Sequence, residues 1–159
     1  MDVLVDGAAL GVPAEVDRGL ALAGFTAPFA IQVEAVPVAL TGKDVCGRAR
    51  TGSGKTLAFA LPMVARIADL GQRPASKRPW GLVLVPTREL AAQVCGELEW
   101  LGRGAKLRAA AVYGGAGFGK QLQALRSMWK LFAMNTWRKV LCLQRLTPSW
   151  KLMVTPKSS

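Results

Sequence analysis

One short stretch predicts which secondary structure should flank it: Ala49-Arg50-Thr51-Gly52-Ser53-Gly54-Lys55-Thr56, or ARTGSGKT. Its glycines carry no side chains, so successive backbone N–H groups can curl around a polyphosphate, and a following helix aims its positive end at the anion. Lys55 adds a charge for the β- and γ-phosphates, and the Thr56 hydroxyl is a candidate ligand of a Mg²⁺ ion bound with the nucleotide. Residues 49–56 are therefore predicted to form a nucleotide-binding loop, with Thr56 as a metal ligand.

The segments on either side of this loop have the pattern that the interpretation requires. Residues 44–47 (DVCG) resemble a strand, and residues 56–69 (TLAFALPMVARIAD) have the apolar spacing of a helix. A glycine-rich turn with a coincidental lysine is the alternative, and the strand–loop–helix context disfavours it.

Further segments alternate between strand and helix along the chain. Strands are predicted at residues 80–85 and 107–112, and helices at residues 13–23, 30–40, 88–100 and from about 119 onwards. Such alternation predicts an α/β fold with a parallel sheet flanked by helices, and ligands are then expected at the carboxyl ends of the strands.

Composition narrows the class of protein. A chain of 159 residues has room for one domain with a real core, and no apolar run approaches the ~18 residues of a membrane span. The first residues lack the basic region of a secretory signal, so we expect a cytoplasmic protein that does not contact a membrane. Three scattered cysteines and no histidine support neither a disulfide framework nor a zinc site.

The net charge of +11 suggests an acidic partner such as nucleic acid, but the charge is unevenly distributed. Residues 127–159 hold six Lys and Arg, no acid and three of the five tryptophans. The change in composition predicts a domain over residues 1–126 and a divergent basic tail over residues 127–159. We interpret the tail as a frameshifted, fused or disordered segment; a basic amphipathic helix that binds a partner or a membrane surface is the alternative.

Four blocks of the sequence resemble the N-terminal RecA-like domain of DEAD-box ATP-dependent RNA helicases. In chain order they are GFTAPFAIQ at residues 24–32, ARTGSGKT at 49–56, PTRELAAQV at 86–94 and YGG at 113–115. The resemblance implies an incomplete RecA-like P-loop domain over residues 1–126, with ATP and Mg²⁺ as cofactors and RNA as the partner. It also implies that Gln32 reads the adenine edge, since an amide both donates and accepts hydrogen bonds.

The same resemblance assigns the RNA contacts. Pro86, Thr87, Arg88 and Glu89 would grip the RNA backbone together with the Gly114-Gly115 loop, without reading bases. Each residue also has a plainer interpretation from its own block. Thr87 and its charged neighbours could be a helix N-cap on a solvated surface, the two glycines a simple turn, and Gln32 an exposed helix residue.

The sequence departs from the family after Arg126. It contains no Asp-Glu-Ala-Asp run, no Ser-Ala-Thr run and no second RecA-like domain, so we assign no catalytic residue. We expect a helicase fragment that is inactive alone. The alternative is a non-enzymatic nucleotide- and RNA-binding regulator, and another P-loop enzyme such as a small kinase is disfavoured by the blocks at 24–32 and 86–94.

Overall fold

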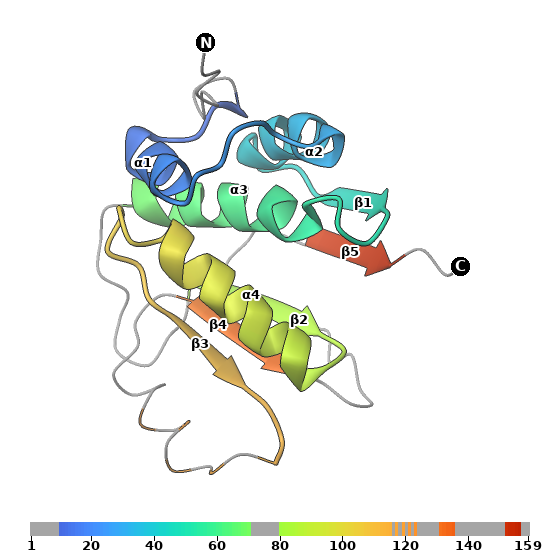
Figure 1. Ribbon diagram of the computed structural model, residues 1–159, viewed down its shortest axis with the longest axis vertical. Helices are drawn as coiled ribbons and strands as arrows, with labels where there is room; N and C mark the ends of the chain where they lie inside the picture. Colours follow the sequence, from blue (N-terminus) through green and yellow to red (C-terminus); the bar gives the residue numbers. More distant parts are fainter. Residues whose placement is uncertain are drawn as a thin grey trace.

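Helices and parallel strands alternate through most of the chain (Figure 1). The computed structural model describes residues 10–70, 80–115, 117, 119, 121, 123, 131–135 and 152–156. The helices are α1 (Ala14–Leu22), α2 (Ala30–Leu40), α3 (Lys55–Asp69) and α4 (Arg88–Leu101). The strands are β1 (Val45–Ala49), β2 (Gly81–Val85), β3 (Ala109–Val112), β4 (Leu131–Asn135) and β5 (Leu152–Pro156).

The described strands form two groups, and every pairing is parallel. β1 pairs with β5, while β4 lies between β2 and β3 in the order β2-β4-β3. Helix α4 lies across the three-stranded group, and α3 lies between α4 and the pair α1–α2 (Figure 1). The predicted α/β fold with a parallel sheet is confirmed.

Helix α3 is at the centre of the core because three of its sides meet other helices. Leu61 and Val64 of α3 are fully buried, as are Val36 of α2 and Leu98 of α4. Gly19 allows α1 to approach α4 closely, because a Cβ at this residue would lie 2.9 Å from the Leu101 carbonyl oxygen. The buried apolar side chains of α3 thus fix the position of the helix that begins at the glycine loop.

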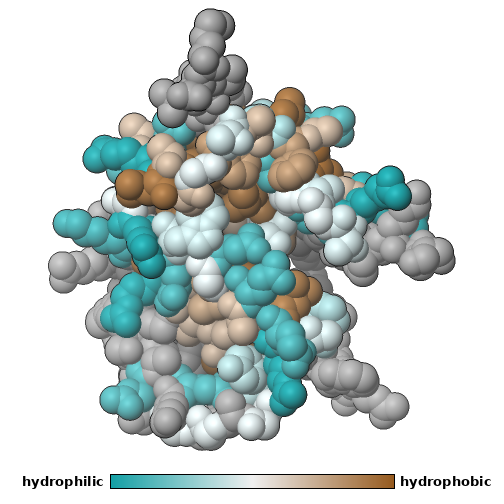
Figure 2. All heavy atoms as spheres, viewed as in Figure 1, coloured by the Kyte–Doolittle hydropathy of each residue, from teal (hydrophilic) through white to brown (hydrophobic). Residues whose placement is uncertain are grey.

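Helix α2 has apolar residues on its exposed side as well as on its buried side, which is unusual for a helix that is only partly covered. Its sequence AIQVEAVPVAL contains two polar residues, Gln32 and Glu34, and Gln32 is buried. Val33 and Val38 are left exposed, as is Leu22 at the end of α1. Figure 2 shows apolar atoms gathered over this part of the surface.

Two other predictions concern segments that the structure describes only in part. The helix expected from residue 119 falls on a stretch of which only alternate residues are described. The segment 127–159 contributes β4 and β5 to the parallel pairings, and its interpretation as a divergent tail stays a prediction. Among the described residues, no helix is long and apolar enough to cross a membrane.

Candidate nucleotide and nucleic-acid site

The predicted glycine loop connects the end of β1 at Ala49 to the start of α3 at Lys55. Gly52 and Gly54 have φ angles of +80° and +74°, in the left-handed region that other residues adopt at a cost. Gly54 is the N-cap of α3, so the unpaired N–H groups of the first helical turn face the loop. These two conformations and the helix end give the loop the geometry of an anion-binding site.

Lys55 is folded back on the loop. Its Nζ donates hydrogen bonds to the carbonyl oxygens of Ala49, at 2.8 Å, and Arg50. The Ser53 hydroxyl donates to the same Arg50 oxygen at 2.7 Å. Because an ammonium group has three donors, Lys55 keeps one donor available and can exchange the other two for phosphate oxygens.

Gln32 links α2 to the glycine loop. Its Nε2 donates to the Gly54 carbonyl oxygen at 3.0 Å, and its Oε1 accepts from the Phe29 N–H at 3.0 Å. The residue is fully buried, so the interpretation as an exposed helix residue is wrong. Its predicted contact with adenine stays a prediction, because in this conformation the amide is bonded within the protein.

Thr87, two residues after the end of β2, is the N-cap of α4. Its Oγ1 accepts a hydrogen bond from the Leu90 N–H at 3.2 Å. The plainer interpretation of Thr87 as a helix cap therefore describes a real contact. The Thr87 side chain also hydrogen-bonds the exposed Glu89 carboxylate, which a phosphate oxygen could replace as acceptor, so the two interpretations are compatible.

Arg88 and Glu89 form an exposed ion pair at 2.6 Å between Nε and Oε1. The hydrogen bond to Glu89 raises the pKa of Arg88, and the hydrogen bond from Arg88 lowers the pKa of Glu89. Both side chains are in water, where such pairs contribute little to stability. Arg88 can thus exchange this partner for a phosphate at little cost.

The fold brings Arg88 next to the predicted Gly114-Gly115 loop. A Cβ placed on Gly115, whose φ is +83°, would lie 3.9 Å from Arg88 Nη1. The loop is held by Gln121, whose Oε1 accepts from the Tyr113 N–H and whose Nε2 donates to the Tyr113 oxygen, both at 3.0 Å. Gln121 could not be predicted as part of this site, since no local pattern shows that its amide meets the end of β3.

The two candidate contact regions both follow the carboxyl ends of strands. The nucleotide loop follows β1, Pro86 and Thr87 follow β2, and both arrowheads point to the right-hand side of Figure 1. This is where ligands bind in open α/β folds.

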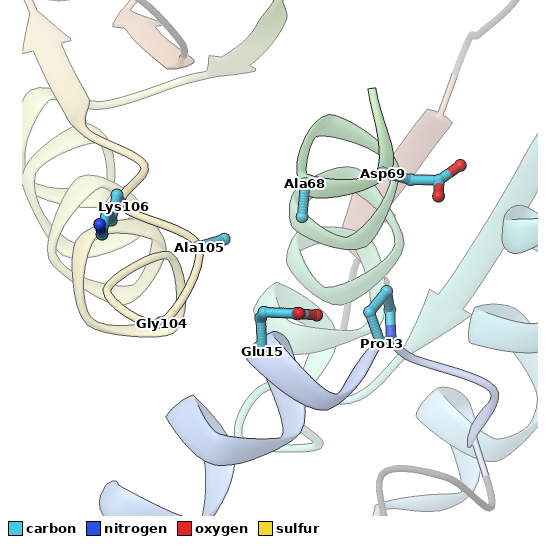
Figure 3. A pocket seen from close by; sticks show the side chains of 7 residues that line it. All are labelled: Pro13, Glu15, Ala68, Asp69, Gly104, Ala105 and Lys106. Atoms are coloured by element: carbon cyan, nitrogen blue, oxygen red, sulfur yellow. The ribbon is translucent and has the colours of Figure 1, made fainter. Parts of the chain in front are cut away.

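A hollow of about 390 Å³ lies at the other end of α3 (Figure 3). Since α3 has 15 residues, this end is about 20 Å from the loop. None of the predicted site residues lines the hollow, which is formed by Pro13, Glu15, Ala68, Asp69, Gly104, Ala105 and Lys106. It lies outside the candidate nucleotide site.

The fold and the loop define a class of protein: an α/β domain with a glycine loop between a parallel strand and the N-terminus of a helix. The model of the DEAD/DEAH box helicase family matches residues 29–154, and the chain belongs to this family. The match continues past Arg126, the boundary that composition predicts, and ends within β5.

Curated relatives agree with this assignment. The chain is 41% identical over 117 residues to "DEAD-box ATP-dependent RNA helicase 24" of Oryza sativa subsp. japonica, covering 74% of this chain and 15% of the relative. It is 43% identical over 118 residues to "Pre-mRNA-processing ATP-dependent RNA helicase PRP5" of Mycosarcoma maydis, covering 73% of this chain and 10% of the relative. The chain thus spans a small part of the length of these proteins.

Solved structures show the same fold. The RNA helicase Prp28 from Chaetomium thermophilum bound to ADP matches with a TM-score of 0.70 and 32% identity, covering 79% of this chain and 31% of that chain. A hypothetical ATP-dependent RNA helicase from Sulfolobus tokodaii matches with a TM-score of 0.63 and 34% identity, covering 76% and 33%. The chain is a fragment of a DEAD-box helicase with an incomplete RecA-like fold.

Proposed function

We propose that this chain is the part of a DEAD-box RNA helicase that binds ATP and touches the RNA backbone. The observation that carries the proposal is the loop between β1 and α3. Two glycines with left-handed backbone precede the N-terminus of α3, and the Lys55 side chain folds back over the loop. Residues 49–56 would hold the phosphates, and Gln32 would contribute to the choice of adenine. Prp28, the solved relative with a TM-score of 0.70, was crystallised with ADP.

The residues present fit a polyphosphate better than they fit a metal ion by themselves. Within the described part of the chain, no group of three or more His, Cys, Asp or Glu could hold a metal. Mg²⁺ would therefore arrive with the nucleotide, bound by its phosphate oxygens and by the Thr56 hydroxyl on the first turn of α3. The ion would supply charge neutralisation at the phosphates.

The RNA contact would be made by Pro86 to Glu89 together with the Gly114-Gly115 loop. Thr87 and Arg88 would exchange their hydrogen bonds to Glu89 for bonds to phosphate oxygens, and Gly115 offers a backbone without a side chain beside Arg88. These groups would contact phosphate oxygens and not the edges of bases, so RNA binding would be independent of base sequence.

We also propose that the chain does not hydrolyse ATP by itself. The acids that follow Lys55 in the sequence are Asp69, Glu89, Glu97 and Glu99. Asp69 ends α3 far from the loop, Glu89 pairs with Arg88, and Glu97 accepts a hydrogen bond from Gln93 on α4. Glu99 is also on α4, where its charge acts on Cys95. These positions support the proposal, because phosphoryl transfer needs an acid that orients the metal and a group that positions the attacking water.

A second candidate function follows from the same placement of acids: a nucleotide- and RNA-binding regulator without catalysis. The two candidates differ in whether the longer helicase supplies the missing groups. Adding a separately produced helicase segment that carries the Asp-Glu-Ala-Asp run, the Ser-Ala-Thr run and the second domain, together with RNA, distinguishes them, because ATP turnover would appear only for the helicase fragment. A cytoplasmic location remains a prediction, since three of the relatives are named for pre-mRNA processing.

The experiment that tests nucleotide binding is the substitution Lys55→Ala, measured by calorimetric titration with Mg-ADP. We expect at least a tenfold loss of affinity, because charge-assisted hydrogen bonds to phosphate contribute about 1.5–3 kcal/mol each. Lys43→Ala is the matched control, since Lys43 is exposed and lies outside the loop. Equal ADP affinity in the Lys55→Ala and Lys43→Ala proteins would show that the loop is not the site.

A further inference from the structure

Phe29, the residue directly before α2, lies against the glycine loop with its ring partly in water. It is 50% exposed, and a Cβ placed on Gly54 would collide with its Cδ2 at 2.6 Å. The Gln32 amide ties the two residues together, because it bonds both the Phe29 N–H and the Gly54 oxygen. The ring is therefore held beside the start of α3.

Helix stability does not explain a phenylalanine at this position. Phe29 is the N-cap of α2, where Ser, Thr, Asp and Asn are preferred because their oxygens accept from the first turn. A phenyl ring has no such oxygen. The same chain caps α4 with Thr87, whose hydroxyl accepts from Leu90. At α2 the protein has an exposed aromatic ring in place of a stabilising cap.

The position of the ring indicates the ligand. A loop built for a polyphosphate lies on one side of it, and nucleotides are polyphosphates that carry a flat, largely apolar base. Aromatic rings stack on any base, because every base has a π-face. Gln32 is fully buried at the same place, whereas the Phe29 ring is accessible to a ligand.

We propose that Phe29 is a base-stacking residue of the nucleotide site, holding the nucleobase regardless of its identity. This inference rests on the proposed binding of nucleotide at residues 49–56. It assigns base affinity to Phe29, and it leaves the choice of base to hydrogen-bonding groups such as Gln32.

The test is Phe29→Thr, because threonine adds the missing cap while removing the ring. Calorimetric titrations with Mg-ADP, Mg-GDP and Mg-tripolyphosphate are compared between the parent chain and the variant. We expect ADP and GDP affinities to fall by a similar factor, roughly fivefold or more. Tripolyphosphate has no base, so its affinity should not change. Thermal denaturation should show an equal or higher midpoint for the variant, since the helix gains a cap.

Phe29→Tyr is the matched control, because it retains the ring and should bind all three ligands as the parent does. Unchanged ADP and GDP affinities in Phe29→Thr would overturn the proposal. A parallel loss for all three ligands would also overturn it, because the ring would then be shaping the phosphate loop. A parent chain that binds none of the three would refute the proposed function itself, and with it this inference.

Discussion

Replacing Gln32 with leucine should destabilise the protein, because the buried amide joins α2 to the glycine loop. The substitution keeps the side-chain volume and removes two hydrogen bonds of 3.0 Å. The Gly54 oxygen keeps its bond from the Ala58 N–H, so losing Gln32 there costs about 1 kcal/mol. The Phe29 N–H loses the partner that the structure gives it, which costs about 1–2 kcal/mol more. We expect the free energy of unfolding in urea to fall by about 2–3 kcal/mol.

The matched control is Gln93→Leu, which removes an exposed hydrogen bond to Glu97 on α4 and should change stability by less than about 0.5 kcal/mol. Gln32→Glu extends the test to pH. Burial raises the pKa of a carboxyl group, so the glutamate variant should regain stability on acidification, when it becomes protonated and can donate to the Gly54 oxygen. If Gln32→Leu is as stable as Gln93→Leu, the amide does not hold the loop.

Three further predictions concern catalysis, charge and thiol chemistry. The chain alone should show no RNA-stimulated ATP turnover above its Lys55→Ala variant, because one missing arginine finger alone lowers the rate by ~10³ or more; measurable turnover above this background would mean that a substitute acid exists. We expect the basic segment 127–159 to dominate non-specific RNA binding. Because this segment contains β4 and β5, the test neutralises its charges and does not delete it. One triple variant replaces Lys130, Lys151 and Lys157 with glutamine, and the control variant replaces Lys43, Arg103 and Lys106. The first variant should lower both the affinity for single-stranded RNA and the salt dependence of that affinity more than the control does. Equal effects of the two triple variants would return the contact to the family motifs. Burial, with a smaller contribution from Glu99, raises the pKa of Cys95 to about 11, so iodoacetamide at pH 8 should label exposed Cys46 before Cys95, as mass spectrometry of the peptides can show.

The glycine loop could be predicted from sequence because its requirements are local. Left-handed backbone at Gly52 and Gly54, a lysine next to them and a helix that begins at once are all properties of consecutive residues. Helices α3 and α4 could be predicted for a similar reason, since their apolar spacing follows from the faces that they bury. The order of the four blocks then pointed to the family, which the comparisons show.

The partners of the site residues could not be predicted, because they are distant in sequence. Gln32 meets Gly54 across 22 positions, and its pattern on α2 is equally compatible with an exposed side chain. Gln121 meets the backbone of Tyr113 across eight positions through a loop. Arg88 and Gly115 lie close only because α4 packs on β3. In each case a side-chain length and a loop path decide the contact, and neither is encoded in a local period.

The segment after Arg126 shows most clearly the difference between what local sequence predicts and what tertiary contacts decide. Its composition, with six cations, no acid and three tryptophans, gives no strand signal that stands above the rest of the segment. The tertiary structure places LFAMN, residues 131–135, between β2 and β3, and LMVTP, residues 152–156, beside β1. A strand in a parallel sheet is selected by neighbours that offer unpaired N–H and C=O groups at its two edges. Local sequence therefore determined the glycine loop and its helix, whereas the available sheet edges, which exist only once the chain has folded, decided which short apolar segments became strands.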